Sequence, residues 1–119
     1  MRAASLLFVG LWLFCCAAHG QETIAQTDAE DVAKGRHLAT LLCTSCHFVA
    51  PDQPYAPTLS PPAPSFAAIA QRKDVSADSL TQFLSTTSQG WNNPRGMPNP
   101  NLAPFQTKAI VAYILSLRR

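Results

Sequence analysis

The stretch Cys43-Thr44-Ser45-Cys46-His47 constrains this chain more than any other part of its sequence. On a helical turn, positions i, i+3 and i+4 share one face, so Cys43, Cys46 and His47 point toward a single object. The spacing C-x-x-C-H is the attachment pattern of c-type haem. The thiols can bond to the two vinyl groups, and the imidazole is then held where it can bind iron. We therefore predict one covalently attached haem c, bound through Cys43 and Cys46.

Other uses of a C-x-x-C pair fit this sequence less well. A thioredoxin-type redox centre needs a βαβ context, and the chain has no convincing strand pattern. A zinc site needs a second pair of ligands at a suitable spacing, and the sequence offers none. A disulfide is the remaining alternative for two cysteines in an oxidising compartment. Haem attachment is the preferred interpretation.

Residues 1–20 have the pattern of a cleavable secretory signal. Arg2 forms a short positive region, residues 6–18 are an apolar run, and Ala18-His19-Gly20 places small residues before a cleavage site at Gln21. The run is shorter than the ~20 residues of a standard transmembrane helix, so an uncleaved anchor is the lesser alternative. We expect a periplasmic protein whose mature chain has no transmembrane segment.

Cleavage would also simplify the cysteine count. Cys15 and Cys16 lie within the signal, and the bulky Phe14 before them fits a lipoprotein acylation site poorly. The mature chain would keep only Cys43 and Cys46, both within the haem motif.

The charge of the mature chain excludes some partners. Without Arg2, eight basic and seven acidic residues remain, a formal net charge of +1. No basic patch indicates nucleic-acid binding, and no charge run indicates strong electrostatic steering. A domain of about 99 residues has a marginal apolar core of its own, which a buried haem would enlarge.

Hydrophobic spacing predicts an all-α fold of about four helices around the haem. Residues 21–27 are expected to be a flexible arm and residues 28–119 the haem domain. Thr27 and Glu30 form a capping-box pattern before a helix that runs to about Leu42. Its apolar face recurs at helical spacing through Val32, Gly35, Ala39 and Leu42.

The segment after the motif holds six prolines between residues 51 and 64, which excludes a helix and favours a stiff extended loop. We interpret it as a rigid cover over one haem edge, with a proline-rich recognition segment as the alternative. Three further helices are predicted: residues 65–70 opened by Ser65, residues 74–86 with Ser76 as cap, and a last helix from Pro104 to the end. The expected inward-facing residues of these helices are Phe66, Ile69, Ala70, Leu80, Phe83, Leu84, Ile110, Tyr113, Ile114 and Leu117.

Met97 lies in a loop rich in glycine, asparagine and proline, residues 88–103. It is the only methionine of the predicted mature chain, and its thioether is a soft ligand for haem iron. Pro98 disfavours a helical conformation at Met97, which suits a ligand presented from a fixed loop. A methionine usually serves as core packing, but this polar loop favours a ligand.

Taken together, these features resemble a class I cytochrome c of the small exported bacterial kind, over about residues 28–119. Gly35 stands before the motif where the family has the glycine at the crossing of its first and last helices. Ala63-Pro64-Ser65-Phe66 resembles the proline segment whose carbonyl accepts a hydrogen bond from the proximal histidine. Met97-Pro98 then precedes a terminal helix with Ile110-Val111-Ala112-Tyr113, whose Tyr113 would pack over Gly35.

The resemblance implies roles for individual residues. Cys43 and Cys46 would form the thioethers, His47 would be the proximal iron ligand and Met97 the distal one. Pro64 would orient His47 and raise its basicity. With both axial positions filled, the expected function is electron transfer between redox proteins that meet the exposed haem edge transiently, without enzymatic activity.

Three other functions stay open. The chain could be a haem subunit bound permanently to a dehydrogenase or an oxidase. It could be a gas-binding sensor in which Met97 is displaced, or a haem enzyme with an open iron position. Among secondary residues, His37 is expected to be solvated, although it is a possible alternative ligand. Trp91 and Arg95 are candidate partners of the haem propionates.

Overall fold

The computed structural model describes residues 21–86 and 96–119, and for residues 21–27 the backbone alone. Four helices follow one another in these ranges: α1 (Gln21–Leu42), α2 (Phe66–Ala70), α3 (Ala77–Thr86) and α4 (Pro104–Ser116). Within the described residues the only β-type pairing is an isolated bridge between His47 and Ala63. The predicted all-α fold is confirmed.

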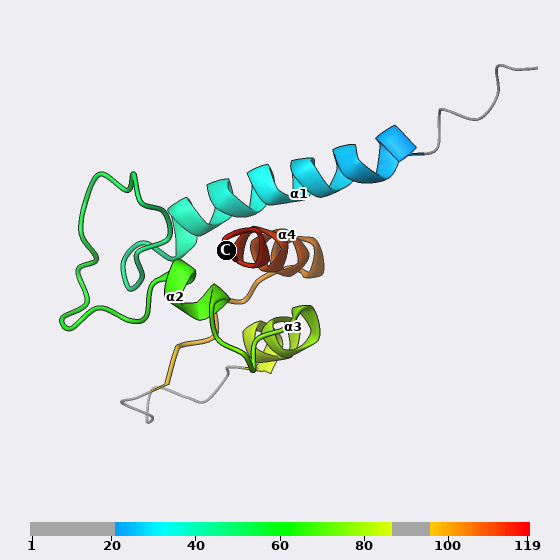
Figure 1. The fold of residues 1–119 in the computed structure, drawn as a ribbon. Coiled ribbons are helices and arrows are strands. Elements are labelled where there is room, and N and C mark those ends of the chain that lie inside the picture. Colours follow the sequence, from blue (N-terminus) through cyan, green and yellow to red (C-terminus); the bar gives the residue numbers. More distant parts are fainter. Residues whose placement is uncertain (1–20, 87–95) are drawn as a thin grey trace, which may run out of the picture.

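Helix α4 occupies the centre of the fold. It lies between α1 on one side and α2 and α3 on the other, and it contacts all three (Figure 1). The long proline-rich loop projects to one side, beyond the end of α1 (Figure 1). Because α4 is covered from several directions, its buried residues extend over more than one face: Thr107, Ala109, Ile110, Val111, Tyr113 and Ile114.

The crossing of α1 and α4 depends on Gly35. A Cβ atom at this position would lie 1.9 Å from the carbonyl oxygen of Ala109 and 2.8 Å from Cβ of Tyr113. Only a residue without a side chain permits such a close approach of two backbones. The predicted packing of Tyr113 over Gly35 is confirmed.

Helix α1 begins at Gln21, six residues before the predicted cap at Thr27. The expected arm 21–27 therefore has a helical backbone. The physical reason is that Gln21 to Gln26 contain no glycine or proline, so the helix continues N-terminally through residues that tolerate it. Leu42 is also exposed, because the buried face continues from Ala39 to Cys43 at the i, i+4 spacing.

Serine caps fix the starts of α2 and α3. The Ser65 hydroxyl accepts a hydrogen bond from the amide of Ala68 at 3.1 Å, and the Ser76 hydroxyl accepts one from the amide of Ser79 at 3.1 Å. Both predicted caps are confirmed. Helix α3 begins at Ala77, later than the predicted Asp74, because the Ser76 cap sets its first turn.

Helix α4 begins after Ala103, whose methyl group offers no acceptor for a cap. The Oε1 atom of Gln106 instead accepts a hydrogen bond from the Ala103 amide at 2.9 Å. This is half of a capping box. A side chain of the helix itself, Gln106, therefore stabilises the first turn of α4.

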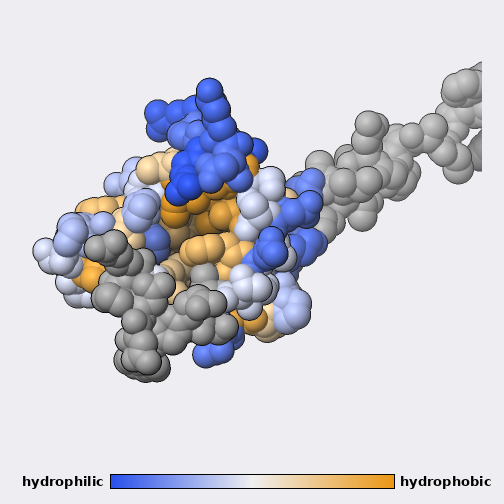
Figure 2. Space-filling model, turned by 90° about the horizontal axis from the view of Figure 1, so that it is seen from below, coloured by the Kyte–Doolittle hydropathy of each residue, from blue (hydrophilic) through white to orange (hydrophobic). Residues whose placement is uncertain are grey.

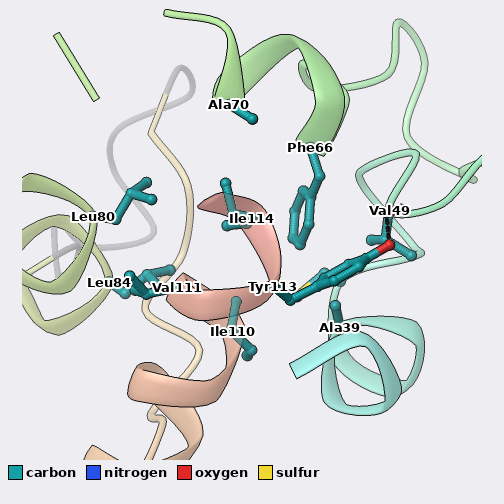
Figure 3. Close-up of a cluster of buried hydrophobic side chains, with 11 residues drawn as sticks. Ala39, Val49, Phe66, Ala70, Leu80, Leu84, Ile110, Val111, Tyr113 and Ile114 are labelled. Carbon is teal, nitrogen blue, oxygen red and sulfur yellow. Dashed lines mark hydrogen bonds between the residues drawn. The ribbon is translucent and has the colours of Figure 1, made fainter. Parts of the chain in front are cut away.

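The core gathers around α4 (Figure 3). The ring of Phe66 lies between the rings of His47 and Tyr113, with centroid separations of 5.5 Å and 6.3 Å. The Tyr113 hydroxyl donates a hydrogen bond to the carbonyl of Val49 at 2.8 Å (Figure 3). Phe83, predicted to face inward, is 50% exposed at the wall of a cavity described below. No helix in the described ranges has the length and apolar character that crossing a membrane requires.

Candidate haem site

The haem motif continues the last turn of α1. The amide of Cys43 donates to the carbonyl of Ala39 at 2.9 Å, and the amides of Cys46 and His47 both donate to the carbonyl of Cys43. These helix-like bonds keep the i, i+3, i+4 relationship of the motif. Cys43, Cys46 and His47 consequently line one and the same cavity.

The proline-rich loop is tied to the motif by backbone hydrogen bonds. The amide of Leu59 donates to the carbonyl of Ser45 at 3.0 Å, and the amide of Ala63 donates to the carbonyl of Cys46 at 2.9 Å. Leu59, Pro61, Ala63 and Pro64 also line the cavity. The loop therefore forms one wall beside the motif, as the interpretation of a rigid cover requires.

The orientation of His47 is set by its Nδ1 atom. The carbonyl oxygen of Pro64 lies 2.7 Å from Nδ1, and because a carbonyl only accepts, Nδ1 carries the proton and donates. The lone pair of the neutral imidazole is then on Nε2, the nitrogen available to a metal. His47 is 8% exposed, and the Phe66 ring packs beside it. The structure thus contains the hydrogen bond that the resemblance implied for Pro64.

The cavity itself has a volume of about 1090 Å³. Helix α2 contributes Phe66 and Ile69 to its wall, and α3 and α4 contribute further apolar side chains. Figure 2 shows the molecule hollowed at this face, with hydrophobic residues visible in the hollow and hydrophilic residues around it. A largely apolar concavity of this size suits a large planar cofactor.

The two thiols differ in their surroundings. Both are free; Cys43 is buried, and Cys46 is intermediate in exposure. Burial raises the pKa of the Cys43 thiol to about 11, and the neighbouring Cys46 adds to the effect. The Cys43 sulfur is therefore a protonated, uncharged thiol at neutral pH, compatible with an apolar wall.

Met97 is half-buried and lines the same cavity as His47. The structure thus brings together all five predicted site residues, with Met97 contributed by a loop distant in sequence from the motif. His37 is exposed on α1 and is not part of the cavity wall. Trp91 and Arg95 lie outside the described residues.

These residues fit a covalently attached haem. The wall of a mostly apolar cavity presents two thiols, one imidazole and one thioether. The Nδ1 atom of the imidazole is engaged in a hydrogen bond, so Nε2 is available to iron. Thiols supply the covalent bonds, and imidazole and thioether are both ligands of haem iron.

One polar feature of the cavity was missed by the sequence reasoning. Arg72 and Asp74 both line it, and the Arg72 Nη2 atom lies 2.8 Å from Oδ2 of Asp74. The hydrogen bonds from Arg72 hold the pKa of the Asp74 carboxyl below its usual range. In the folded chain both residues stand between α2 and α3, although Asp74 was predicted to begin the third helix. Local patterns gave no orientation for either side chain, so only the folded chain reveals their position.

An all-α chain with C-x-x-C-H thiols on an apolar cavity belongs to the small c-type haem proteins. The family model of cytochrome c matches residues 32–118. The chain is also 40% identical over 90 residues to cytochrome c-552 of Bradyrhizobium diazoefficiens, covering 76% of this chain and 78% of that protein. No solved structure gives a significant match.

The chain therefore belongs to the cytochrome c family, as a class I cytochrome c. Its cofactor is haem c, covalently attached at the C-x-x-C-H motif of Cys43 and Cys46. It is an electron-transfer haem protein.

Proposed function

We propose that this protein is an exported carrier that moves one electron at a time between redox proteins, with His47 and Met97 as the axial ligands of its haem iron. The observation that carries the proposal is the hydrogen bond of 2.7 Å between Nδ1 of His47 and the Pro64 carbonyl. Because this hydrogen bond engages Nδ1, Nε2 remains available to bind the metal. Met97 lines the same cavity.

Ligation by two side chains argues for a carrier. When bound, the haem takes up and releases one electron at its iron. His47 and Met97 would leave no axial position for oxygen or a substrate, which opposes both the enzyme and the gas sensor. The thioether and the apolar walls favour the reduced state, because neither stabilises the extra positive charge of ferric iron as water does.

The setting of the carrier follows from the predicted signal. Removal of residues 1–20 in the periplasm would place the haem domain, residues 28–119, among periplasmic redox proteins. Contact through the exposed haem edge would be small and transient, below about 1,200 Å² in total, as for other electron-transfer encounters.

A potentiometric titration of the purified holoprotein, followed by absorption, tests the carrier function. We expect one reversible transition with the slope of a one-electron couple, and no reaction of the reduced wild type with carbon monoxide. Met97→Ala serves as the matched control, because it opens one axial position and is expected to bind carbon monoxide. Ready binding by the wild type would contradict the proposal and favour a gas sensor or an enzyme.

A permanent haem subunit is the second candidate, and one exposed aromatic side chain near the motif favours it. Tyr55, on the proline-rich loop, is 82% exposed and is not part of the cavity wall. A dehydrogenase or an oxidase that covered this loop would bury it. Copurification of the tagged protein from native membrane and periplasmic fractions distinguishes the two: a free carrier is recovered alone, and a subunit is recovered in a fixed ratio with its partner.

A further inference from the structure

The C-terminal end of the chain is fastened to the turn between α2 and α3. Beyond the end of α4, Arg118 donates from Nε to the carbonyl of Ala70 at 3.1 Å and from Nη2 to the carbonyl of Val75. A third bond runs the other way, from Nε2 of Gln71 to the carbonyl of Leu117 at 3.0 Å. Residues 70–75 will be called the α2–α3 turn.

The two carbonyl groups mark the two ends of this turn. Ala70 is the last residue of α2 and is 1% exposed, so its carbonyl is one of the helix-end groups that need an external donor. Val75 directly precedes Ser76, which caps α3. A guanidinium group has several donors in one rigid plane and can hold both carbonyls together, whereas a lysine ammonium lacks this fork.

The same turn is part of the wall of the haem cavity. Arg72, Asp74 and Val75 all line the cavity. Helix α3 starts two residues after the turn and contributes Leu80 and Phe83 to the wall. A displacement of the turn would therefore move this wall and change how much water reaches the haem.

We propose that Arg118 is a positioning residue for the haem cavity: by joining the carbonyls of Ala70 and Val75, it holds the α2–α3 turn against α4 and excludes water from the haem. Water stabilises the more highly charged ferric form, so this positioning raises the reduction potential. The inference rests on the proposed electron-carrier function, since its effect on the potential requires a reversible haem couple.

Arg119 gives a matched control. It follows Arg118 directly and carries the same charge, but it makes no hydrogen bond or ion pair with the described part of the chain. Arg118→Gln and Arg119→Gln therefore remove the same charge from neighbouring positions, and only the first removes the two bonds to the turn. Arg118→Lys keeps the charge but removes the planar set of donors that binds both carbonyls. It serves as a milder second variant if Arg118→Gln retains too little haem.

The test measures two properties of each holoprotein. The first is the ratio of oxidised to reduced protein at a fixed applied potential. The second is hydrogen exchange at the Val75 amide, which donates to the Arg72 carbonyl within the turn. For Arg118→Gln we expect at least a threefold shift toward the oxidised form and at least tenfold faster exchange. Arg118→Lys should show smaller changes in the same directions, and Arg119→Gln should match the wild type.

Two results would overturn the proposal. Equal shifts in Arg118→Gln and Arg119→Gln would assign the effect to charge alone. Faster exchange in Arg118→Gln with an unchanged ratio would make Arg118 a structural residue that does not act on the haem. Failure of the carrier function would be recognised separately, because carbon monoxide would then bind the reduced wild type.

Discussion

The Nδ1 atom of His47 lies 2.7 Å from the carbonyl oxygen of Pro64, which stands 17 residues farther along the chain. Backbone pairing brings the two together: the Ala63 amide donates to the Cys46 carbonyl at 2.9 Å, and His47 and Ala63 form a parallel bridge. The imidazole is thus oriented by backbone geometry, and no second side chain is needed to fix its tautomer.

Replacing Pro64 by alanine should consequently have a small effect. The acceptor is a backbone carbonyl and is retained in Pro64→Ala, while the unfolded chain gains freedom worth about 0.4–1 kcal/mol. We expect a loss of this size in the free energy of unfolding, measured with denaturant, and an unchanged absorption spectrum. Pro62→Ala, at an exposed position off the cavity wall, is the control. A spectrum altered by Pro64→Ala alone would show that the proline ring itself supports His47.

Gly35→Ala tests the crossing of α1 and α4. The new methyl group would lie 1.9 Å from the Ala109 carbonyl oxygen, so the helices must separate. Overpacking of this kind costs about 1–3 kcal/mol or more, against a gain of ~1 kcal/mol in helix propensity. We expect a net loss of stability and a lower thermal midpoint. His37→Ala, an exposed change on the same helix, should stay within about 0.5 kcal/mol of the wild type; equal behaviour of the two variants would refute the close crossing.

Local sequence patterns were sufficient for features that depend on near neighbours. Ser65 and Ser76 each cap a helix through an amide three residues away, and the C-x-x-C-H motif is a single turn. The contact of Gly35 with Tyr113 was accessible only through the family resemblance. The spacing of apolar residues in a single sequence does not show which two helices cross at Gly35.

Other features could not be foreseen, for different physical reasons. The capping-box pattern predicts a start of the first helix at Thr27, but residues 21–26 contain no glycine or proline that would stop a helix, and α1 begins at Gln21. Arg118, which belongs to the predicted last helix, donates hydrogen bonds to the carbonyls of Ala70 and Val75, 48 and 43 residues away in sequence. Contacts of such separation depend on how helices dock, and hydrophobic periodicity does not determine their partners.

Tyr113→Phe should destabilise the protein and change its response to alkali. The variant loses the bond of 2.8 Å to the Val49 carbonyl, and leaving a buried acceptor unpaired costs about 1–3 kcal/mol. Burial raises the pKa of Tyr113 above its ordinary value of 10.0. The folded state therefore holds this proton more tightly than the unfolded chain does. The corresponding stability is complete below about pH 10 and is lost as the pH rises through the raised pKa.

Denaturant unfolding of the wild type and Tyr113→Phe at about pH 8 and about pH 11 measures both effects. The wild type should exceed the variant in stability at the lower pH, and the difference should shrink at the higher pH. A difference that is equal at both values would contradict the assigned pKa shift.

The predicted signal peptide defines the location and the N-terminus of the mature chain. Expression with the native leader should yield a periplasmic protein that begins at Gln21 and carries one covalent haem. Intact-mass spectrometry and N-terminal sequencing of the periplasmic fraction measure this. A chain that keeps residues 1–20 and stays with the membrane would instead support the uncleaved anchor.

Ligation by Met97 is the central claim, and an absorption spectrum of the oxidised holoprotein tests it most directly. We predict a far-red charge-transfer band in the wild type, from sulfur coordinated to ferric iron, and its loss in Met97→Ala with the covalent haem retained. A wild-type spectrum without this band, or a band that persists in Met97→Ala, would contradict ligation by His47 and Met97 and with it the proposed closed electron carrier.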